Sequence, residues 1–366
     1  MLPFPVIMGP TASGKSALAL ACARAFSGEI ISADSMQVYR GLDIGTAKPS
    51  PEERREIPHH LVDVVDPEER FDLFSFRDRT EELIAEIRSR GRLPILAGGT
   101  GLYIRAVVYG LDRMPADREL RRKLDAEFDN PEGFGRLKEI MRKLAPDDYE
   151  KSSMHCRRLI RSYEINLLTG KSMCELQKTW KKAGPRRDAV QFVLLPDREV
   201  LKERIRRRCE IMLESGWIEE TRRLRERGLF SAPTAWQALG YPLVRDFLDG
   251  LIPRRELADR IATATWQFAR KQLTWFRGQH SEALPLDIRK PEAELVSEIK
   301  SALERNALHV FPERIFHKKG DLPPCPPKRG RGRRPSGSRS PWGQWRMARE
   351  PSPQAFMQGF ANSDFL

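Results

Sequence analysis

Phosphate-binding chemistry is the strongest functional signal in this chain. Eight consecutive residues follow the pattern G-x-x-x-x-G-K-[ST]: Gly9, Pro10, Thr11, Ala12, Ser13, Gly14, Lys15 and Ser16. In such a loop the backbone N–H groups surround a di- or triphosphate, Lys15 adds a positive charge, and the Ser16 hydroxyl can ligate Mg²⁺. An apolar run precedes the motif and a helix-like segment follows it, which disfavours a chance match. We therefore predict a phosphate-binding loop at residues 9–16.

A carboxylate and an amide follow the next apolar run. Asp34 comes directly after residues 29–33, so it lies at the carboxyl end of a predicted strand, where open α/β sheets bind ligands. Its carboxylate could hold Mg²⁺ through water or accept a proton from an acceptor substrate. Gln37 carries an amide suited to reading a nucleobase edge. The alternative for Asp34 is a structural cap of a helix or turn.

A third predicted strand ends without an acid. Residues 94–97 lead into Gly98-Gly99-Thr100-Gly101, where a motor-type nucleotide hydrolase would usually place an Asp. This difference favours a site that binds a diphosphate without hydrolysing a γ-phosphate. Thr100 could donate a hydrogen bond to a phosphate or nucleotide, and helix capping is the alternative.

The elements that must position these residues alternate as in a parallel α/β sheet. The patterns predict strands at 4–8, 29–33, 62–65, 94–97 and 189–195, and helices at 16–26, 75–90, 102–109 and 198–227. Between about 112 and 187 the pattern is helical only, with stops at prolines and glycines, and a helical part continues through residue 303. We therefore predict a catalytic core at 1–111 and 188–309 with a helical insertion at 112–187.

Positive charge is concentrated in two segments of a chain whose net charge is +13. The span 118–187 has 18 Lys and Arg against 11 acidic residues, and the span 314–349 has 11 against the single Asp321. A basic segment of this kind is typical of nucleic-acid binding. The composition of 310–366, rich in Pro, Gly, Ser and Arg, predicts a disordered basic tail, either weakly polyanion-binding or an inert solubilising extension.

Several classes of protein are disfavoured by composition. No apolar run approaches the roughly 20 residues needed to cross a bilayer, and the phosphate-binding motif begins too early to leave room for a signal peptide. The five cysteines are scattered and odd in number, which predicts neither a disulfide framework nor a zinc site. We expect a cytoplasmic protein without membrane contact.

Several motifs together resemble one enzyme family. They are Gly9 to Ser16, Ser32-Ala-Asp-Ser-Met-Gln-Val-Tyr39, Gly45-Thr-Ala-Lys-Pro49, His59-His-Leu61 and Gly98-Gly-Thr-Gly-Leu-Tyr103, followed by Arg157-Arg158-Leu-Ile-Arg161, Arg208 with Met212 and Gly216, and Ala238-Leu-Gly-Tyr241. In this order they are similar to tRNA dimethylallyltransferases, also called tRNA isopentenyltransferases. The resemblance runs from about residue 5 to 277, and five of its motifs lie within the first 103 residues.

The resemblance implies a P-loop-type core that transfers the dimethylallyl group of dimethylallyl diphosphate to N6 of the adenosine 3′ to the anticodon, position 37, in tRNAs that read codons beginning with U. Diphosphate is the leaving group, and Lys15, the loop amides, Ser16 through Mg²⁺, and Arg208 would stabilise its charge. Asp34 is the candidate base, and Thr11 would help to hold the amine or the diphosphate. The alternative for Arg208 is a solvated charge on a helix.

The resemblance also implies tRNA contacts, because the target base must leave the anticodon-loop stack to reach the site. The expected tRNA-binding residues are Asp34, Ser35, Met36, Gln37, Thr100, Arg121, Arg157, Arg158 and Arg161. The basic insertion would hold the stem-loop backbone by charge and shape, and each of its arginines could instead be an ordinary surface charge. We expect a monomer.

Two other activities fit the motifs. An isopentenyltransferase of the same chemistry acting on free AMP, ADP or ATP would not need the basic insertion, and a P-loop small-molecule kinase would use Asp34 to activate a hydroxyl. The chain departs from the family pattern at Trp266, where an Arg is usual, and at Pro242-Leu243, which replace a polar pair. The first departure predicts one lost phosphate or tRNA contact, and the second predicts a changed loop.

Overall fold

The computed structural model describes residues 2–111, 114–180 and 184–310. The predicted tail, 310–366, lies outside these ranges except for Val310, which ends the last helix. None of the described helices is both long enough and apolar enough to span a bilayer.

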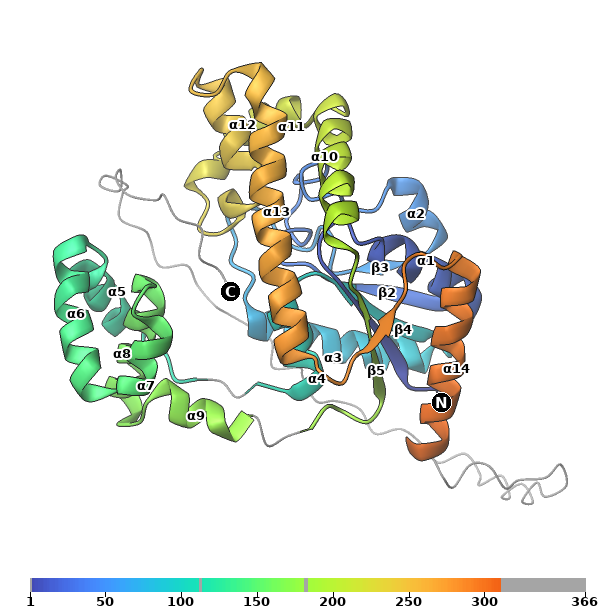
Figure 1. Cartoon of the computed structure of the whole chain (residues 1–366), viewed down its shortest axis with the longest axis horizontal. Coiled ribbons are helices and arrows are strands. Elements are labelled where there is room, and N and C mark those ends of the chain that lie inside the picture. The colour runs from blue at the N-terminus through green and yellow to red at the C-terminus, as the bar shows by residue number, and fades with distance from the viewer. Residues whose placement is uncertain (1, 112–113, 181–183, 311–366) are drawn as a thin grey trace, which may run out of the picture. The chain divides into compact units, whose positions relative to one another are not determined.

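A six-stranded sheet with all strands parallel forms the centre of the core (Figure 1). Its strands lie in the order β3-β2-β4-β1-β5-β6. Their bounds are β1 Phe4–Met8, β2 Gly28–Ala33, β3 His59–His60, β4 Leu93–Gly98, β5 Ala189–Leu194 and β6 Leu284–Leu286. This sheet confirms the predicted α/β class, and it brings the carboxyl ends of β2, β4 and β1 together as neighbours.

Helices cover both faces of the sheet. The helices α1 (Lys15–Phe26) and α14 (Glu292–Val310) pack on one face through a buried cluster that includes Ile7, Phe192 and Ile299. On the other face α3 (Leu73–Ser89) and α4 (Gly101–Tyr109) pack through a second cluster, which includes Phe4 and Phe76. The short α2 (Pro51–Glu56) begins at a capping box made by Ser50 and Glu53. This layered burial fixes the strand ends that carry the site residues.

One strand prediction was wrong, and one strand was missed. The expected strand at 62–65 does not form, because Leu61 and Asp63 adopt positive φ angles of 60° and 57° that interrupt an extended backbone. The strand lies earlier, at His59–His60, and Val65 makes only an isolated bridge with Tyr39. The three-residue β6 was not predicted, because a segment as short as Leu284–Leu286, with a proline at its centre, has no measurable periodicity.

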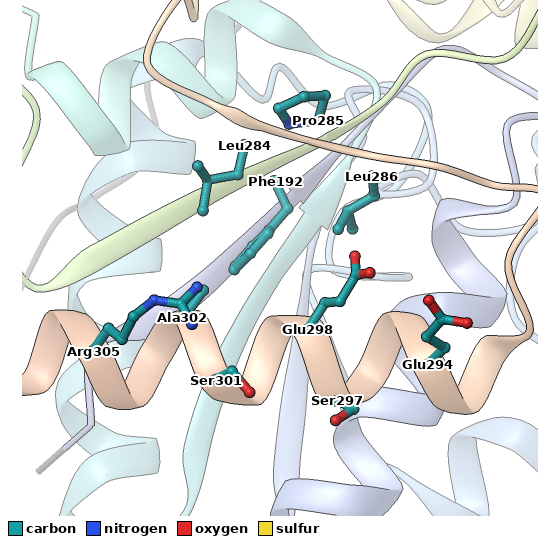
Figure 2. A pocket seen from close by; sticks show the side chains of 10 residues that line it. All are labelled: Phe192, Leu284, Pro285, Leu286, Glu294, Ser297, Glu298, Ser301, Ala302 and Arg305. Atoms are coloured by element: carbon teal, nitrogen blue, oxygen red, sulfur yellow. The ribbon is translucent and has the colours of Figure 1, made fainter.

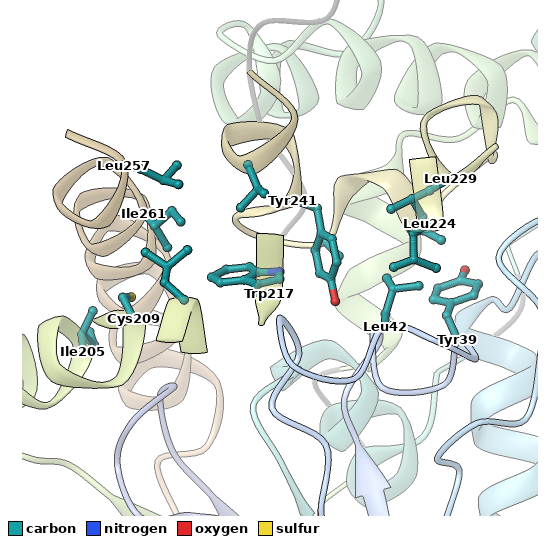
Figure 3. Packing of buried hydrophobic residues seen from close by; sticks show 14 of the residues in the cluster. Tyr39, Leu42, Ile205, Cys209, Trp217, Leu224, Leu229, Tyr241, Leu257 and Ile261 are labelled. Atoms are coloured by element: carbon teal, nitrogen blue, oxygen red, sulfur yellow. The ribbon is translucent and has the colours of Figure 1, made fainter. Parts of the chain in front are cut away.

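The helix expected over 198–227 is two helices. The helix α10 (Arg198–Glu214) ends before Gly216, whose φ of 98° is left-handed, and α11 (Trp217–Glu226) begins after it. They pack with α12 (Tyr241–Leu248) and the 26-residue α13 (Arg254–Gln279) around Trp217 and Tyr241 (Figure 3). The short 3-10 turns at Leu229–Ser231 and Ala235–Gln237 connect α11 to α12. Tyr39 and Leu42, from the loop after β2, lie in the same cluster, so these C-terminal helices support that loop.

Within the described residues 114–180 every regular element is a helix. These helices are α5 Arg118–Phe128, α6 Pro131–Leu144, α7 Pro146–Ser152, α8 Cys156–Thr169 and α9 Met173–Trp180. They have a hydrophobic cluster of their own, centred on Leu124, Leu137, Met141 and Leu159. The domain boundaries at 112 and 187 stay a prediction.

Candidate active site

The phosphate-binding loop connects β1 to α1 as the motif predicted. Gly14 caps α1 with a φ of 94°, so the first turn of the helix directs its free N–H groups to the loop. Ser13 is buried, and its hydroxyl has no hydrogen-bond partner among the described residues. A buried hydroxyl without a partner carries a desolvation cost, which an anion in the loop would offset. The loop is therefore suited to an anionic ligand.

Two cations lie at this loop, one within it and one on a neighbouring helix. Lys15 Nζ donates to the carbonyl of Pro10 at 3.3 Å, and Arg208 approaches from α10. Burial and then the charge of Arg208 lower the pKa of Lys15 to about 8, while Asp34 opposes that shift. Burial also lowers the pKa of Arg208. In the described part of the chain neither cation forms an ion pair with a carboxylate, so both charges are available to a bound anion.

Asp34 lies just past the end of β2, within electrostatic range of Lys15 and Arg208. Its Oδ1 accepts hydrogen bonds from the backbone N–H groups of Met36 at 2.9 Å and Gln37 at 3.3 Å. Oδ1 of Asp34 therefore caps the turn that follows β2, as the structural alternative expected. Within the ranges that the structure covers, Oδ2 has no hydrogen-bond partner, so the second oxygen is open to a substrate.

Thr100 connects two of the loops at this sheet edge. Its Oγ1 accepts the N–H of Ser35 at 3.1 Å, and it lies 3.5 Å from the Ser35 hydroxyl. Thr100 occupies the position before α4 but makes no side-chain cap there. Thr100 therefore does not cap α4 with its side chain. Instead its hydroxyl contacts Ser35, the residue next to Asp34.

The Gln37 side chain, which is expected to read an adenine edge, makes hydrogen bonds to protein groups in this structure. Its Oε1 accepts from the Ser32 hydroxyl at 3.0 Å, and its Nε2 donates to the carbonyls of Thr46 and Ala47 at 3.1 and 3.2 Å. Both amide hydrogens are thus directed to protein carbonyls. In this structure the side chain holds the 45–49 loop against β2, and its role in tRNA binding stays a prediction.

A buried glutamate holds the other side of that loop. Glu220 on α11 accepts the N–H groups of Asp43, Ile44 and Gly45 at 3.1, 2.7 and 3.2 Å, and the Tyr241 hydroxyl at 2.6 Å. Glu220 was not predicted as a site residue, because nothing in the pattern around it distinguishes it from the other charges of α11.

Gln272 on α13 was also missed. Its Oε1 accepts the backbone N–H of Thr11 at 2.9 Å, and its Nε2 donates to the carbonyl of Gly99 at 2.8 Å. The side chain is 4% exposed. From α10, Arg204 lies 3.4 Å from the Ser13 carbonyl. The phosphate-binding loop is therefore supported by two helices that come much later in the chain.

The arginines expected to bind tRNA have different surroundings. Arg121 and Arg161 both pair with Glu164, whose side chain is 1% exposed, and their hydrogen bonds lower the pKa of that carboxyl against the effect of burial. A buried carboxylate needs these partners, so both arginines have a structural role. Arg157 is exposed and lies 3.6 Å from Asp129. Arg158 is exposed on α8, and no ion pair is found for it within the described residues.

The two departures from the family pattern have local explanations. The guanidinium of Arg198 and the ammonium of Lys202 each lie 5.5 Å from the centre of the Trp266 ring. Positive charge is therefore still present at this position, supplied by α10 through cation–π contacts. Pro242 lies in the first turn of α12, where its missing N–H is tolerated.

A cavity of about 440 Å³ lies away from these loops, between β5, β6 and α14. Figure 2 shows Phe192 and Leu286 on its sheet side and Glu294, Glu298 and Arg305 on its helix side. The two glutamates form ion pairs with Lys290. In the part of the chain that the structure describes, this cavity therefore lacks a pair of free cations, like Lys15 and Arg208, that could bind an anionic ligand. The described residues contain no cluster of three His, Cys, Asp or Glu that could hold a metal ion.

Comparison with known proteins points to one family. A family model described as IPP transferase matches residues 37–279. A tRNA dimethylallyltransferase of Halalkalibacterium halodurans is 41% identical over 278 residues, covering 75% of this chain and 87% of that protein. Another, from Symbiobacterium thermophilum, is 43% identical over 298 residues, covering 80% of this chain and 91% of that protein.

Two solved structures have the same fold. The full-length tRNA isopentenylpyrophosphate transferase of Bacillus halodurans superposes with a TM-score of 0.61 at 38% identity, covering 84% of this chain and 98% of the other. A eukaryotic dimethylallyltransferase, described as acting on tRNA, superposes with a TM-score of 0.68 at 26% identity, covering 87% and 82%.

Proposed function

The chain belongs to the IPP transferase family and is a prenyl transferase that modifies tRNA, and from this premise we propose its substrates and the roles of its residues. It transfers the dimethylallyl group from dimethylallyl diphosphate to N6 of the adenosine at position 37, next to the anticodon, in tRNAs that read codons beginning with U. One observation supports this proposal most directly: Lys15 and Arg208 lie together at the phosphate-binding loop, near Asp34. Within the described residues neither of these cations forms an ion pair with a carboxylate.

Diphosphate departure is the step that the cations serve. As the bond between the allylic carbon and oxygen breaks, negative charge grows on the diphosphate while the carbon becomes cationic. Lys15, Arg208 and the N–H groups at the start of α1 are positioned to stabilise the departing charge. A site that excludes water also protects the allylic cation from hydrolysis.

Mg²⁺ fits the oxygen donors at this loop. The Ser16 hydroxyl lies in the first turn of α1, next to the N–H groups that would hold the diphosphate. In loops of this motif the Ser hydroxyl ligates Mg²⁺ together with substrate phosphates and water. When bound, the ion would neutralise charge on the diphosphate.

Asp34 is the proposed base for the acceptor amine. The N6 lone pair is delocalised into the adenine ring, so the amine is a weak nucleophile, and removal of its proton helps as the N–C bond forms. The free Oδ2 would accept that proton, because Oδ1 is held by the turn that follows β2. Thr11, in the phosphate-binding loop, would hold the amine or the diphosphate by its hydroxyl. The adenine must leave its stack to reach these groups.

The basic helical segment would hold the anticodon stem-loop. Arg158 and Arg157 are the exposed candidates for phosphate contacts, whereas Arg121 and Arg161 would act by keeping Glu164 and the α5–α8 packing in place. Near the base, Ser35, Met36 and Thr100 would line the entrance together with Asp34. We propose that the chain works as a monomer in the cytoplasm.

The substrate proposal is tested by incubating the protein with labelled dimethylallyl diphosphate and either unmodified tRNA or free AMP. We expect label in tRNA at the adenosine of position 37 and none in AMP. Label in AMP alone would show an adenylate isopentenyltransferase, and label at another tRNA position would contradict the proposed specificity. A tRNA with guanosine at position 37 serves as the control, because it has no N6 amine.

Replacing Arg158 by alanine is expected to weaken tRNA binding and to flatten its salt dependence. If Arg158 neutralises one phosphate, the log–log slope against salt falls by about 0.7–0.9. Binding measured across a range of salt concentrations checks this. Lys300→Ala is the matched control, because it removes an exposed positive charge from α14, outside the basic segment. An unchanged slope for Arg158→Ala would make it an ordinary surface charge.

A further inference from the structure

We propose that Gln272 is a positioning residue for prenyl transfer, because it fixes the phosphate-binding loop and the Asp34 side of the site in one geometry. This inference rests on the proposed roles of Thr11 and Asp34. Gln272 lies on α13, 261 residues after Thr11, and its side chain forms hydrogen bonds with the backbone of Thr11 and Gly99 and none with Asp34. Its effect would pass through two backbone groups.

The first contact holds Thr11. Gln272 Oε1 accepts the Thr11 N–H at 2.9 Å, so this loop amide is directed to the protein and not to the phosphates. The next residue, Ala12, has a φ of 62°, a left-handed conformation that is strained for a residue with a side chain. A strained turn persists only where its surroundings hold it, and the Gln272 amide is one such restraint. The Thr11 hydroxyl is thereby fixed relative to the loop.

The second contact holds the loop after β4. Gln272 Nε2 donates to the Gly99 carbonyl at 2.8 Å, and the next residue, Thr100, holds the Ser35 N–H beside Asp34. Gly99 permits this approach, because a Cβ there would lie 2.6 Å from Gln272 Nε2. The chain of contacts from Gln272 through Gly99, Thr100 and Ser35 therefore ends next to the proposed base.

A side-chain amide makes both contacts at once, because its oxygen accepts and its nitrogen donates. One end must accept from an N–H and the other must donate to a carbonyl, which also fixes the amide orientation. A glutamate keeps the oxygen that accepts from the Thr11 N–H, but its second oxygen cannot donate to the Gly99 carbonyl. A methionine of similar length makes neither hydrogen bond. Gln272→Glu therefore removes only the contact with Gly99, whereas Gln272→Met removes the contacts with both Gly99 and Thr11.

Steady-state kinetics of Gln272→Glu and Gln272→Met test the proposal. For Gln272→Glu we expect kcat to fall by about 10–100-fold while the KM for dimethylallyl diphosphate is retained. The reason is that only the contact with Gly99, which leads to Asp34, is lost. For Gln272→Met we expect a similar fall in kcat, a higher KM for dimethylallyl diphosphate and weaker binding of inorganic diphosphate. The reason is that the hydrogen bonds to Thr11 and Gly99 are both lost. Binding of tRNA should not change.

The matched controls are Gln267→Glu and Gln267→Met, because Gln267 is exposed on the same helix. Thermal unfolding of every variant gives the folded fraction, and turnover is counted per folded molecule. Wild-type kinetic constants for Gln272→Met, or losses explained entirely by the folded fraction, would overturn the proposal. If Gln272→Met folds poorly, Gln272→Glu against Gln267→Glu decides the matter by the same criteria. Failure of the wild-type protein to label tRNA would overturn the proposed function, which this assay distinguishes from a failure confined to Gln272.

Discussion

Replacing Asp34 by asparagine is expected to lower kcat for prenyl transfer by about 10²–10⁴-fold, the usual contribution of a positioned general base. Asparagine keeps the Oδ1 acceptor for the N–H groups of Met36 and Gln37, so the turn after β2 should stay intact. It loses the second carboxylate oxygen, which is the proposed proton acceptor. Single-turnover transfer to tRNA, measured with bound dimethylallyl diphosphate, reports the chemical step directly.

The same variant should bind tRNA with near wild-type affinity, because the basic helical segment is unchanged. Asp259→Asn is the matched control, since Asp259 is exposed on α13 and lies outside the proposed machinery. Turnover by Asp34→Asn within tenfold of the wild type would remove Asp34 from the role of base and leave it as a turn cap.

The second large effect is expected for Lys15→Ala, which removes one of two cations beside the phosphate-binding loop. Loss of one preorganised donor to a developing negative charge typically costs about 10²–10³-fold in rate. We expect a loss of this size in kcat/KM for dimethylallyl diphosphate, with Arg208 still giving residual binding. Kinetics at saturating tRNA measure it, and Lys300→Ala, an exposed lysine on α14, is the control. Unchanged kcat/KM would contradict the proposed role.

The pKa of Lys15 gives this prediction a pH signature. Burial and Arg208 lower that pKa to about 8 in the free protein. The ammonium is therefore present below pH 8 and loses its proton as the pH rises through that value, so the KM for dimethylallyl diphosphate should rise above about pH 8. Lys15→Arg keeps its charge throughout this range and should flatten the profile. A rise of equal size in Lys15→Arg would assign the titration to another group.

The parts of the site that follow strand ends were predictable from the sequence. A strand, a glycine-rich loop and a helix occur together at residues 4–26, and Asp34 follows a strand directly, so local pattern placed both at the same sheet edge. The comparisons confirm the α/β fold and the family. The assignments of the individual site residues stay predictions.

The parts that were missed depend on contacts between distant segments. Gln272 and Glu220 are ordinary polar residues of helices by local pattern, and only the packing of α11 and α13 gives their side chains backbone partners. The pairing of Arg121 and Arg161 with the buried Glu164 was also missed, because charge along a sequence does not reveal such a contact; the tRNA contacts of both arginines stay a prediction. A motif can therefore identify the groups that react, but not those that hold them.

The distance between Thr11 and Gln272 along the chain has a consequence during synthesis. The phosphate-binding loop leaves the ribosome first, and α13 follows 261 residues later. At typical rates of about 5–20 residues per second, this delay is roughly 13–50 s. During that interval the nascent chain carries a complete phosphate-binding motif without the amide that restrains it. If Gln272 has the proposed role, a ribosome-bound chain becomes competent for prenyl transfer only after α13 has emerged and docked.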